Sequence, residues 1–128
     1  MKYIISYLWA ILWAAFMLTI MLLPAKEFSG YPVFEGFDKL VHCGIFFVLT
    51  TLLYWAVIHS TDRKANKWIT LFTIVTVTVG FAILTELAQK YLSPTRSADV
   101  WDIFADAVGL GMSSFAFVLF YKRRKSRT

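Results

Sequence analysis

The sequence is dominated by four long apolar blocks that are separated by short polar segments. The blocks span about residues 3–23, 40–58, 68–87 and 101–121. Each block is close to the roughly 20 residues that a helix needs to cross the hydrocarbon core of a bilayer. Backbone polar groups in lipid must be satisfied within the span, so we expect helices even in the third block, which is rich in Val, Ile and Thr. The pattern predicts an all-α membrane protein with four transmembrane helices in an antiparallel bundle.

The composition supports a membrane protein and argues against a soluble one. Apolar residues make up 59% of the 128 residues and charged residues 16%, whereas soluble domains have about 45–50% and about 25%. The single cysteine, Cys43, excludes an internal disulfide. The first block is longer than a signal-peptide core and is followed by Pro24 without an A-x-A cleavage pattern, so we expect an uncleaved helix. There is no internal repeat, and we predict one transmembrane domain over residues 1–128.

The distribution of Lys and Arg predicts the orientation of the chain. With four spans, both termini and the middle connection share one side, which holds nine of the 13 basic residues. The other side holds Lys26, Lys39, Lys90 and Arg96. Because the side richer in Lys and Arg is usually cytoplasmic, we expect both termini in the cytoplasm. Orientation and anionic lipid explain these juxtamembrane charges, so the bilayer is an expected partner and nucleic acid is not.

The acidic residues lie on the opposite side from most of the basic ones. Seven of the eight are there: Glu27, Glu35, Asp38, Glu86, Asp99, Asp102 and Asp106. A carboxylate inside a span costs up to about 3 kcal/mol and usually faces the bundle interior. A spacing of three and four residues places one stripe on the fourth helix: Asp99, Asp102, Asp106, Gly109 and Ser113. We predict that this stripe faces the other helices, because small residues permit close helix packing.

Three helices bring ionisable residues to a similar depth on this side. His42, Glu86 and Asp106 each lie about one turn inside the end of their helix. The candidate ligand-binding residues are Asp38, Lys39, His42, Glu86, Gln89, Arg96, Asp99, Asp102 and Asp106. His42 and Glu86 could form a general acid–base pair. No cofactor is predicted, but a divalent cation such as Mg²⁺, Mn²⁺ or Zn²⁺ could be held by His42, Glu86, Asp102 and Asp106.

Purely structural roles explain some of these residues. Asp99 and Asp102 could cap the start of the fourth helix. Arg96 and Asp99 could form a surface ion pair, which stabilises little. These interpretations are weaker for Glu86 and Asp106 together, because two carboxylates at one depth need a proton, a cation or Arg96 to compensate them.

Three motifs in this order resemble those of the VanZ-like proteins. They are Asp38–His42 (DKLVH), Glu86–Gln89 (ELAQ) and Arg96–Asp102 (RSADVWD). The family carries D-K-x-x-H at the second helix, E-x-x-Q at the third and R-x-x-D-x-x-D before the fourth, so the resemblance covers essentially the whole chain. The family commonly has Asn at the position of Asp106. An amide there could only hydrogen-bond, whereas a carboxylate could bind a cation or hold a proton.

The resemblance implies a small bacterial cell-envelope protein of the inner membrane. The family is named for a protein associated with low-level resistance to teicoplanin. We therefore expect a protein that binds an amphiphile at an outward-facing polar site and affects glycopeptide susceptibility. The expected partner is a lipoglycopeptide antibiotic or a polyprenyl-linked cell-wall precursor, whose pyrophosphate would suit Arg96 and Lys39.

Two alternatives remain open from the sequence. One is a membrane enzyme that acts on a lipid-linked substrate with a carboxylate–histidine or metal site. The other is a structural partner subunit in which the polar residues lock the helices together. The chain has no Ser–His–Asp order, no glycine-rich phosphate loop and no H-E-x-x-H motif.

Overall fold

The computed structural model describes residues 2–22, 37–92 and 100–124. It contains helices α1 (Lys2–Leu22), α2 (Phe37–Ser60), α3 (Lys67–Leu92) and α4 (Val100–Phe120), and no strand in these ranges. All four helices are long and apolar enough to cross a membrane. The prediction of an all-helical structure with four helices able to span a membrane is thus confirmed for these ranges, and the chain has the build of a multi-pass membrane protein.

The helix ends follow local signals as well as hydropathy. α1 runs from Lys2 to Leu22, two residues before Pro24 in the sequence. α3 begins after Asn66, whose side-chain oxygen accepts hydrogen bonds from the N–H groups of Trp68 and Ile69 at 3.0 and 3.1 Å, as an N-cap does. α3 continues to Leu92, five residues beyond the predicted block, because glutamine and lysine lower the hydropathy but still favour a helix.

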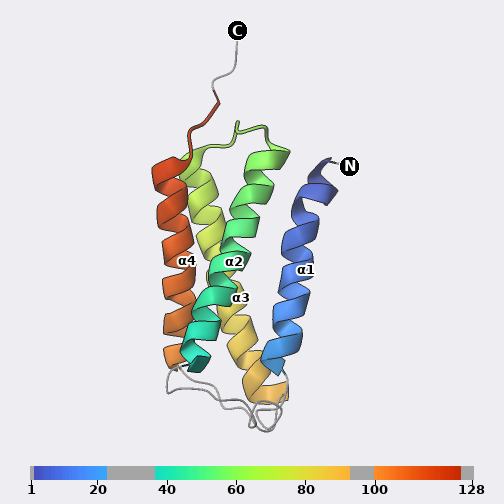
Figure 1. Cartoon of the computed structure of the whole chain (residues 1–128), viewed down its shortest axis with the longest axis vertical. Helices are drawn as coiled ribbons and strands as arrows, with labels where there is room; N and C mark the ends of the chain where they lie inside the picture. The colour runs from blue at the N-terminus through green and yellow to red at the C-terminus, as the bar shows by residue number, and fades with distance from the viewer. Residues whose placement is uncertain (1, 23–36, 93–99, 125–128) are drawn as a thin grey trace.

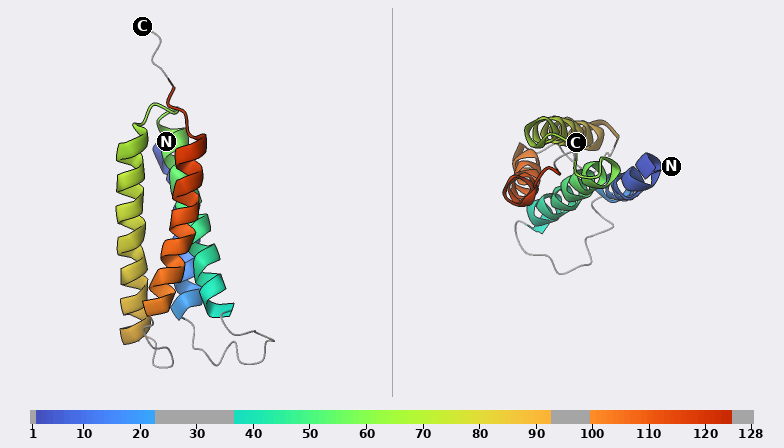
Figure 2. Two further views of the ribbon diagram at one scale, coloured as in Figure 1. Left: turned by 90° about the vertical axis from the view of Figure 1, so that its left-hand side faces the viewer. Right: turned by 90° about the horizontal axis from the view of Figure 1, so that it is seen from above.

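The four helices lie side by side along one long axis (Figure 1). The first residues of α1, the last of α2 and α4 and the first of α3 lie at one end, which we call the basic end. Its placed basic side chains are Arg63, Lys64, Lys67, Lys122, Arg123 and Arg124. The opposite end, where α2 and α4 begin and α3 ends, is called the acidic end. Seen along the axis, α1 lies on the outer side of α2, away from α4 (Figure 2).

Two apolar clusters fill the bundle. One lies between α1, α2 and α3 and is built around Met17, Phe46, Leu49 and Ala82. The other lies between α2, α3 and α4 toward the basic end, and consists of Tyr54, Ile74, Phe117 and Tyr121. The rings of Tyr54 and Phe117 are stacked with centroids 4.2 Å apart. Such close packing matters in a bilayer, because lipid tails are as apolar as the side chains and supply no hydrophobic drive between helices.

The helices α2 and α4 approach each other at Gly109. A methyl group at Gly109 would overlap the carbonyl oxygen of Cys43 and would lie 3.0 Å from the backbone nitrogen of Phe47. Hydrogen bonds reinforce this contact one turn further along, where the hydroxyls of Thr51 and Ser113 are 2.9 Å apart. This approach brings the first turns of α2 and α4 together, and those turns carry the predicted site.

The connection between α2 and α3 is tied to the end of α4. The hydroxyl of Tyr121 donates to the carbonyl oxygen of Ala65 at 2.8 Å. The ammonium of Lys67 donates to the carbonyl oxygen of Val118 at 2.9 Å. α2 ends in a turn in which Asp62 and Arg63 have φ angles of 52° and 64°. The basic end is thus held together by bonds to backbone carbonyls.

Candidate functional site

The structure brings five ionisable side chains together at the acidic end. We call this group the polar cluster: Lys39, His42, Glu86, Asp102 and Asp106. Its centre is His42, whose Nδ1 is 2.9 Å from Asp106 Oδ1 and whose Nε2 is 3.7 Å from Asp102 Oδ2. Lys39 Nζ donates to Asp102 Oδ1 at 2.7 Å. Two helices, α2 and α4, therefore supply a continuous series of alternating basic and acidic groups.

Most of the polar cluster is inaccessible. Asp106 is 0% exposed, His42 2%, and Glu86 and Asp102 4% each. Only Lys39 reaches the surface, with a side chain that is 36% exposed. Buried charges are costly unless they are paired and hydrogen-bonded. The cluster therefore has a buried interior and a single accessible lysine at its rim.

Helical spacing explains how the side chains meet. Residues three or four apart lie on one face of a helix, which places Lys39 above His42 on α2 and Asp102 above Asp106 on α4. The buried residues of α4 are Asp102, Ala105, Asp106, Gly109, Leu110, Ser113, Ser114 and Phe117. They include Asp102, Asp106, Gly109 and Ser113, which are the described part of the predicted stripe. The prediction that this stripe faces the other helices is thus confirmed. The close approach at Gly109 then brings the two faces within hydrogen-bond distance.

Glu86 adds a third helix to the polar cluster. One donor atom each from His42, Glu86 and Asp102 lie within 4.8 Å of one another. A nitrogen and carboxylate oxygens are ligands that divalent metals such as Mn²⁺ and Zn²⁺ accept. Glu86 Oε2 and Asp106 Oδ2 are buried and take no hydrogen bond from a described residue, although both residues have other contacts. His42, Glu86 and Asp102 are therefore the part of the described chain that could hold a cation.

The remaining predicted site residues are placed differently. Gln89 is buried, but its amide nitrogen donates to the carbonyl oxygen of Met21 at 2.9 Å, so it joins α3 to α1. Asp38 lies in the first turn of α2, and its side chain is outside the described residues. Arg96 and Asp99 also lie outside the described residues. Their predicted roles stay predictions.

The arrangement favours positive charge and can position a proton. Three carboxylates share the cluster with one lysine and one histidine. This excess of acid attracts a cation or a proton to the site. A histidine whose Nδ1 bonds a carboxylate has a fixed ring orientation, which is the geometry of an oriented base. The site therefore has the groups for cation binding and for acid–base chemistry.

One feature of the described structure is absent from the sequence predictions. An apolar groove runs between α1, α2 and α3, and two small residues of α1, Ala10 and Ala14, line it. Their spacing of four residues on one face is the only sequence signal that could have indicated it. The groove lies away from the polar cluster.

Comparison with known proteins identifies a relative but no function. No protein-family model matches the chain, and no solved structure matches it. An uncharacterized protein of the fission yeast Schizosaccharomyces pombe is 33% identical over 87 residues, which are 68% of this chain and 50% of the relative. The chain thus spans about half the length of this relative.

Proposed function

We propose that the chain is a VanZ-like membrane protein whose polar cluster binds the phosphate-bearing head group of an amphiphile. In this proposal the helices form an antiparallel bundle with both termini in the cytoplasm, and the acidic end faces the outside. The excess of Lys and Arg on the side of the termini and the middle connection supports that orientation. The membrane would be the inner membrane of a bacterium.

The observation that carries the proposal is the burial of four ionisable groups behind one accessible lysine. A charged residue within a span costs up to about 3 kcal/mol. An interhelical polar bond in a membrane returns only about 0.6 kcal/mol on average. A role limited to locking the helices would therefore recover little of the cost. Ligand binding would account for the buried charges, so we prefer it to the role of a structural partner subunit.

The charges of the polar cluster suggest how a phosphate would be held. The ammonium of Lys39 has three donors, and one of them is directed at Asp102. Because the Lys39 side chain is 36% exposed, a head group at the rim can approach its ammonium. The carboxylates alone would repel a phosphate, but a divalent cation between His42, Glu86 and Asp102 would bridge to it. A polyprenyl-linked precursor suits this chemistry through its pyrophosphate, and a lipoglycopeptide is the other candidate.

Replacing Lys39 with glutamine should weaken head-group binding about tenfold, the loss of roughly one charge-assisted hydrogen bond. The measurement is the affinity of the protein in nanodiscs for a polyprenyl pyrophosphate, with Mg²⁺ or with a chelator. Lys90→Gln is the matched control, because Lys90 is an exposed lysine on the last turn of α3 at the same end. Equal affinity of the wild type and Lys39→Gln would contradict the proposal. In cells, the same pair tests whether the site affects teicoplanin susceptibility.

A second candidate function is an acid–base enzyme on a lipid-linked substrate, favoured by the 2.9 Å bond between His42 and Asp106. A positioned general base contributes about 10²–10⁴-fold to a rate. His42→Gln should then reduce turnover by such a factor and leave head-group binding measurable, with product followed by mass spectrometry. His59→Gln is the control, because His59 bonds Ser6 at the basic end. An unchanged lipid after incubation with the wild type would exclude this candidate.

A further inference from the structure

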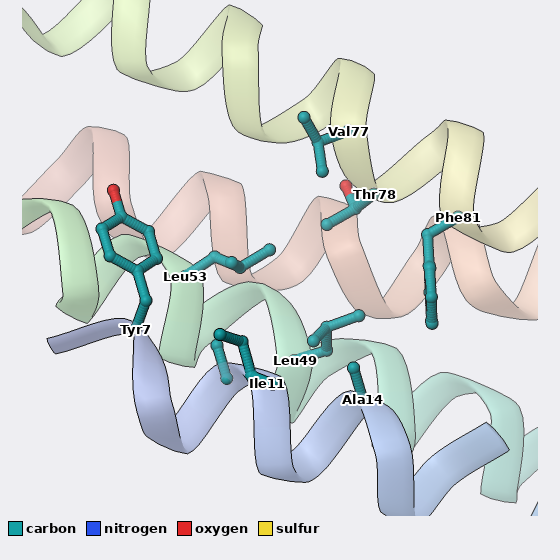
Figure 3. Close-up of a pocket in the computed structure, with 9 residues that line it drawn as sticks. Tyr7, Ile11, Ala14, Leu49, Leu53, Val77, Thr78 and Phe81 are labelled. Atoms are coloured by element: carbon teal, nitrogen blue, oxygen red, sulfur yellow. The ribbon is translucent and has the colours of Figure 1, made fainter. Parts of the chain in front are cut away.

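An apolar groove of about 310 Å³ lies between α1, α2 and α3 (Figure 3). Its lining residues are Tyr7, Ala10, Ile11, Ala14, Leu49, Leu53, Val77, Thr78 and Phe81. Figure 3 shows α1 on one side of the groove and α3 on the other, with Leu49 and Leu53 of α2 between them. The groove lies near the middle of the spans and reaches toward the basic end.

Along its middle, the groove has apolar walls. The hydroxyl of Thr78 donates to the carbonyl oxygen of Ile74 within its own helix, at 2.8 Å. The other lining groups along its middle are hydrocarbon. Because the groove lies within membrane-spanning helices, the groups available to fill it are hydrocarbon chains.

Tyr7 gives the groove a polar end on the basic side. It lies five residues from the start of α1, which is about 7.5 Å along the helix. Among the described residues, its hydroxyl has no hydrogen-bond partner, and Figure 3 shows it directed away from α1. Tyrosine combines an apolar ring with a polar group and is typical of the level of the lipid head groups. The Tyr7 hydroxyl is therefore free to bond the ester or phosphate of a lipid whose chain occupies the groove.

The charge of the adjacent protein end selects the kind of lipid. Arg63, Lys64 and Arg123 at the basic end are exposed. Clustered basic residues next to a span attract anionic head groups. The groove and this basic surface thus complement the two parts of an anionic phospholipid.

We propose that the groove seats one acyl chain of an anionic phospholipid from the leaflet at the basic end, with its ester region at Tyr7. This site is distinct from the polar cluster, and the proposal does not depend on the function proposed for that cluster. It also holds for either orientation of the chain in the membrane.

The test compares two alanines of α1. Ala14→Leu places a larger side chain in the groove, and Ala15→Leu places the same side chain on the exposed neighbouring position. Delipidated protein is supplied with equal amounts of phosphatidylglycerol and phosphatidylcholine, and the bound lipid is counted by native mass spectrometry. We expect the wild type and Ala15→Leu to retain one phosphatidylglycerol, and Ala14→Leu to bind it about tenfold more weakly. Tyr7→Phe should also weaken retention, whereas Tyr3→Phe, at an exposed position, should not.

Each other result would overturn the proposal. Equal lipid retention by Ala14→Leu and Ala15→Leu would show that the groove is not the site. Equal retention of the two lipids would remove the anionic selectivity. A change of oligomeric state in Ala14→Leu, with lipid retention unchanged, would show that a second copy of the chain occupies the groove.

Discussion

Replacing Gly109 with alanine is expected to lower the free energy of unfolding by about 2–3 kcal/mol, as overpacking of a tight interior does. The added methyl group would overlap the carbonyl oxygen of Cys43 and crowd the backbone nitrogen of Phe47. These are backbone atoms, which cannot turn aside as a side chain would. The helices α2 and α4 would therefore have to separate.

The separation should also weaken ligand binding. Gly109 lies one turn from Asp106, so a displacement of α4 lengthens the 2.9 Å contact between His42 and Asp106. We expect Gly109→Ala to lose stability and head-group affinity together. Unfolding is measured by titration with sodium dodecyl sulfate in mixed micelles, followed by circular dichroism.

Gly111 provides the matched control for this substitution. It lies two residues further along α4, and a methyl group there would meet nothing within 4 Å. Alanine favours a helix over glycine by up to about 1 kcal/mol, so Gly111→Ala should keep or slightly raise the stability. If Gly109→Ala and Gly111→Ala unfold at the same detergent fraction, then α2 and α4 are not in close contact at Gly109.

The number and the type of the helices could be predicted because a bilayer limits both. A span must be apolar, helical and about 20 residues long, so the four blocks predict four helices directly. The ends are less well defined, as α3 shows. Its polar residues Gln89 and Lys90 leave the apolar window but continue the helix to Leu92. Hydropathy marks where the lipid ends, whereas helix propensity and capping decide where the helix ends.

The candidate site could be predicted only up to the level of single helix faces. Spacing within α4 correctly predicts that Asp102, Asp106 and Gly109 share a buried face. The partner of His42 depends on how α2 crosses α4, which is decided by the contact at Gly109. Gln89 shows the same limit, because spacing places it on the face of Glu86 but its amide bonds the backbone of α1. The bonds at the basic end use backbone carbonyls, which every sequence has, so no residue pattern could indicate them.

Replacing His42 with leucine is expected to destabilise the bundle by about 3 kcal/mol, because it removes the imidazole that faces two buried carboxylates. Asp106 and Asp102 both face the ring of His42, at 2.9 and 3.7 Å. The double variant His42→Leu/Asp106→Leu removes one of these acids as well and should recover part of the loss. Asp106→Asn keeps an oxygen for the hydrogen bond, so it should have the smallest effect. The measurement is a double-mutant cycle on the free energy of unfolding in mixed micelles.

The size of the coupling decides what kind of interaction the pair makes. Polar pairs between membrane helices average about 0.6 kcal/mol in such cycles. A coupling well above this value would mark the His42–Asp106 pair as an ion pair and not an ordinary hydrogen bond, whereas additive effects would show that the two residues act independently.

Head-group affinity then separates the effect of the pair on stability from its effect on function. If the double variant is folded but no longer binds polyprenyl pyrophosphate, the pair belongs to the binding site, and the cost of burying it is explained by the ligand. If the folded double variant binds as the wild type does, the polar cluster only holds α2 against α4, and the proposed function fails.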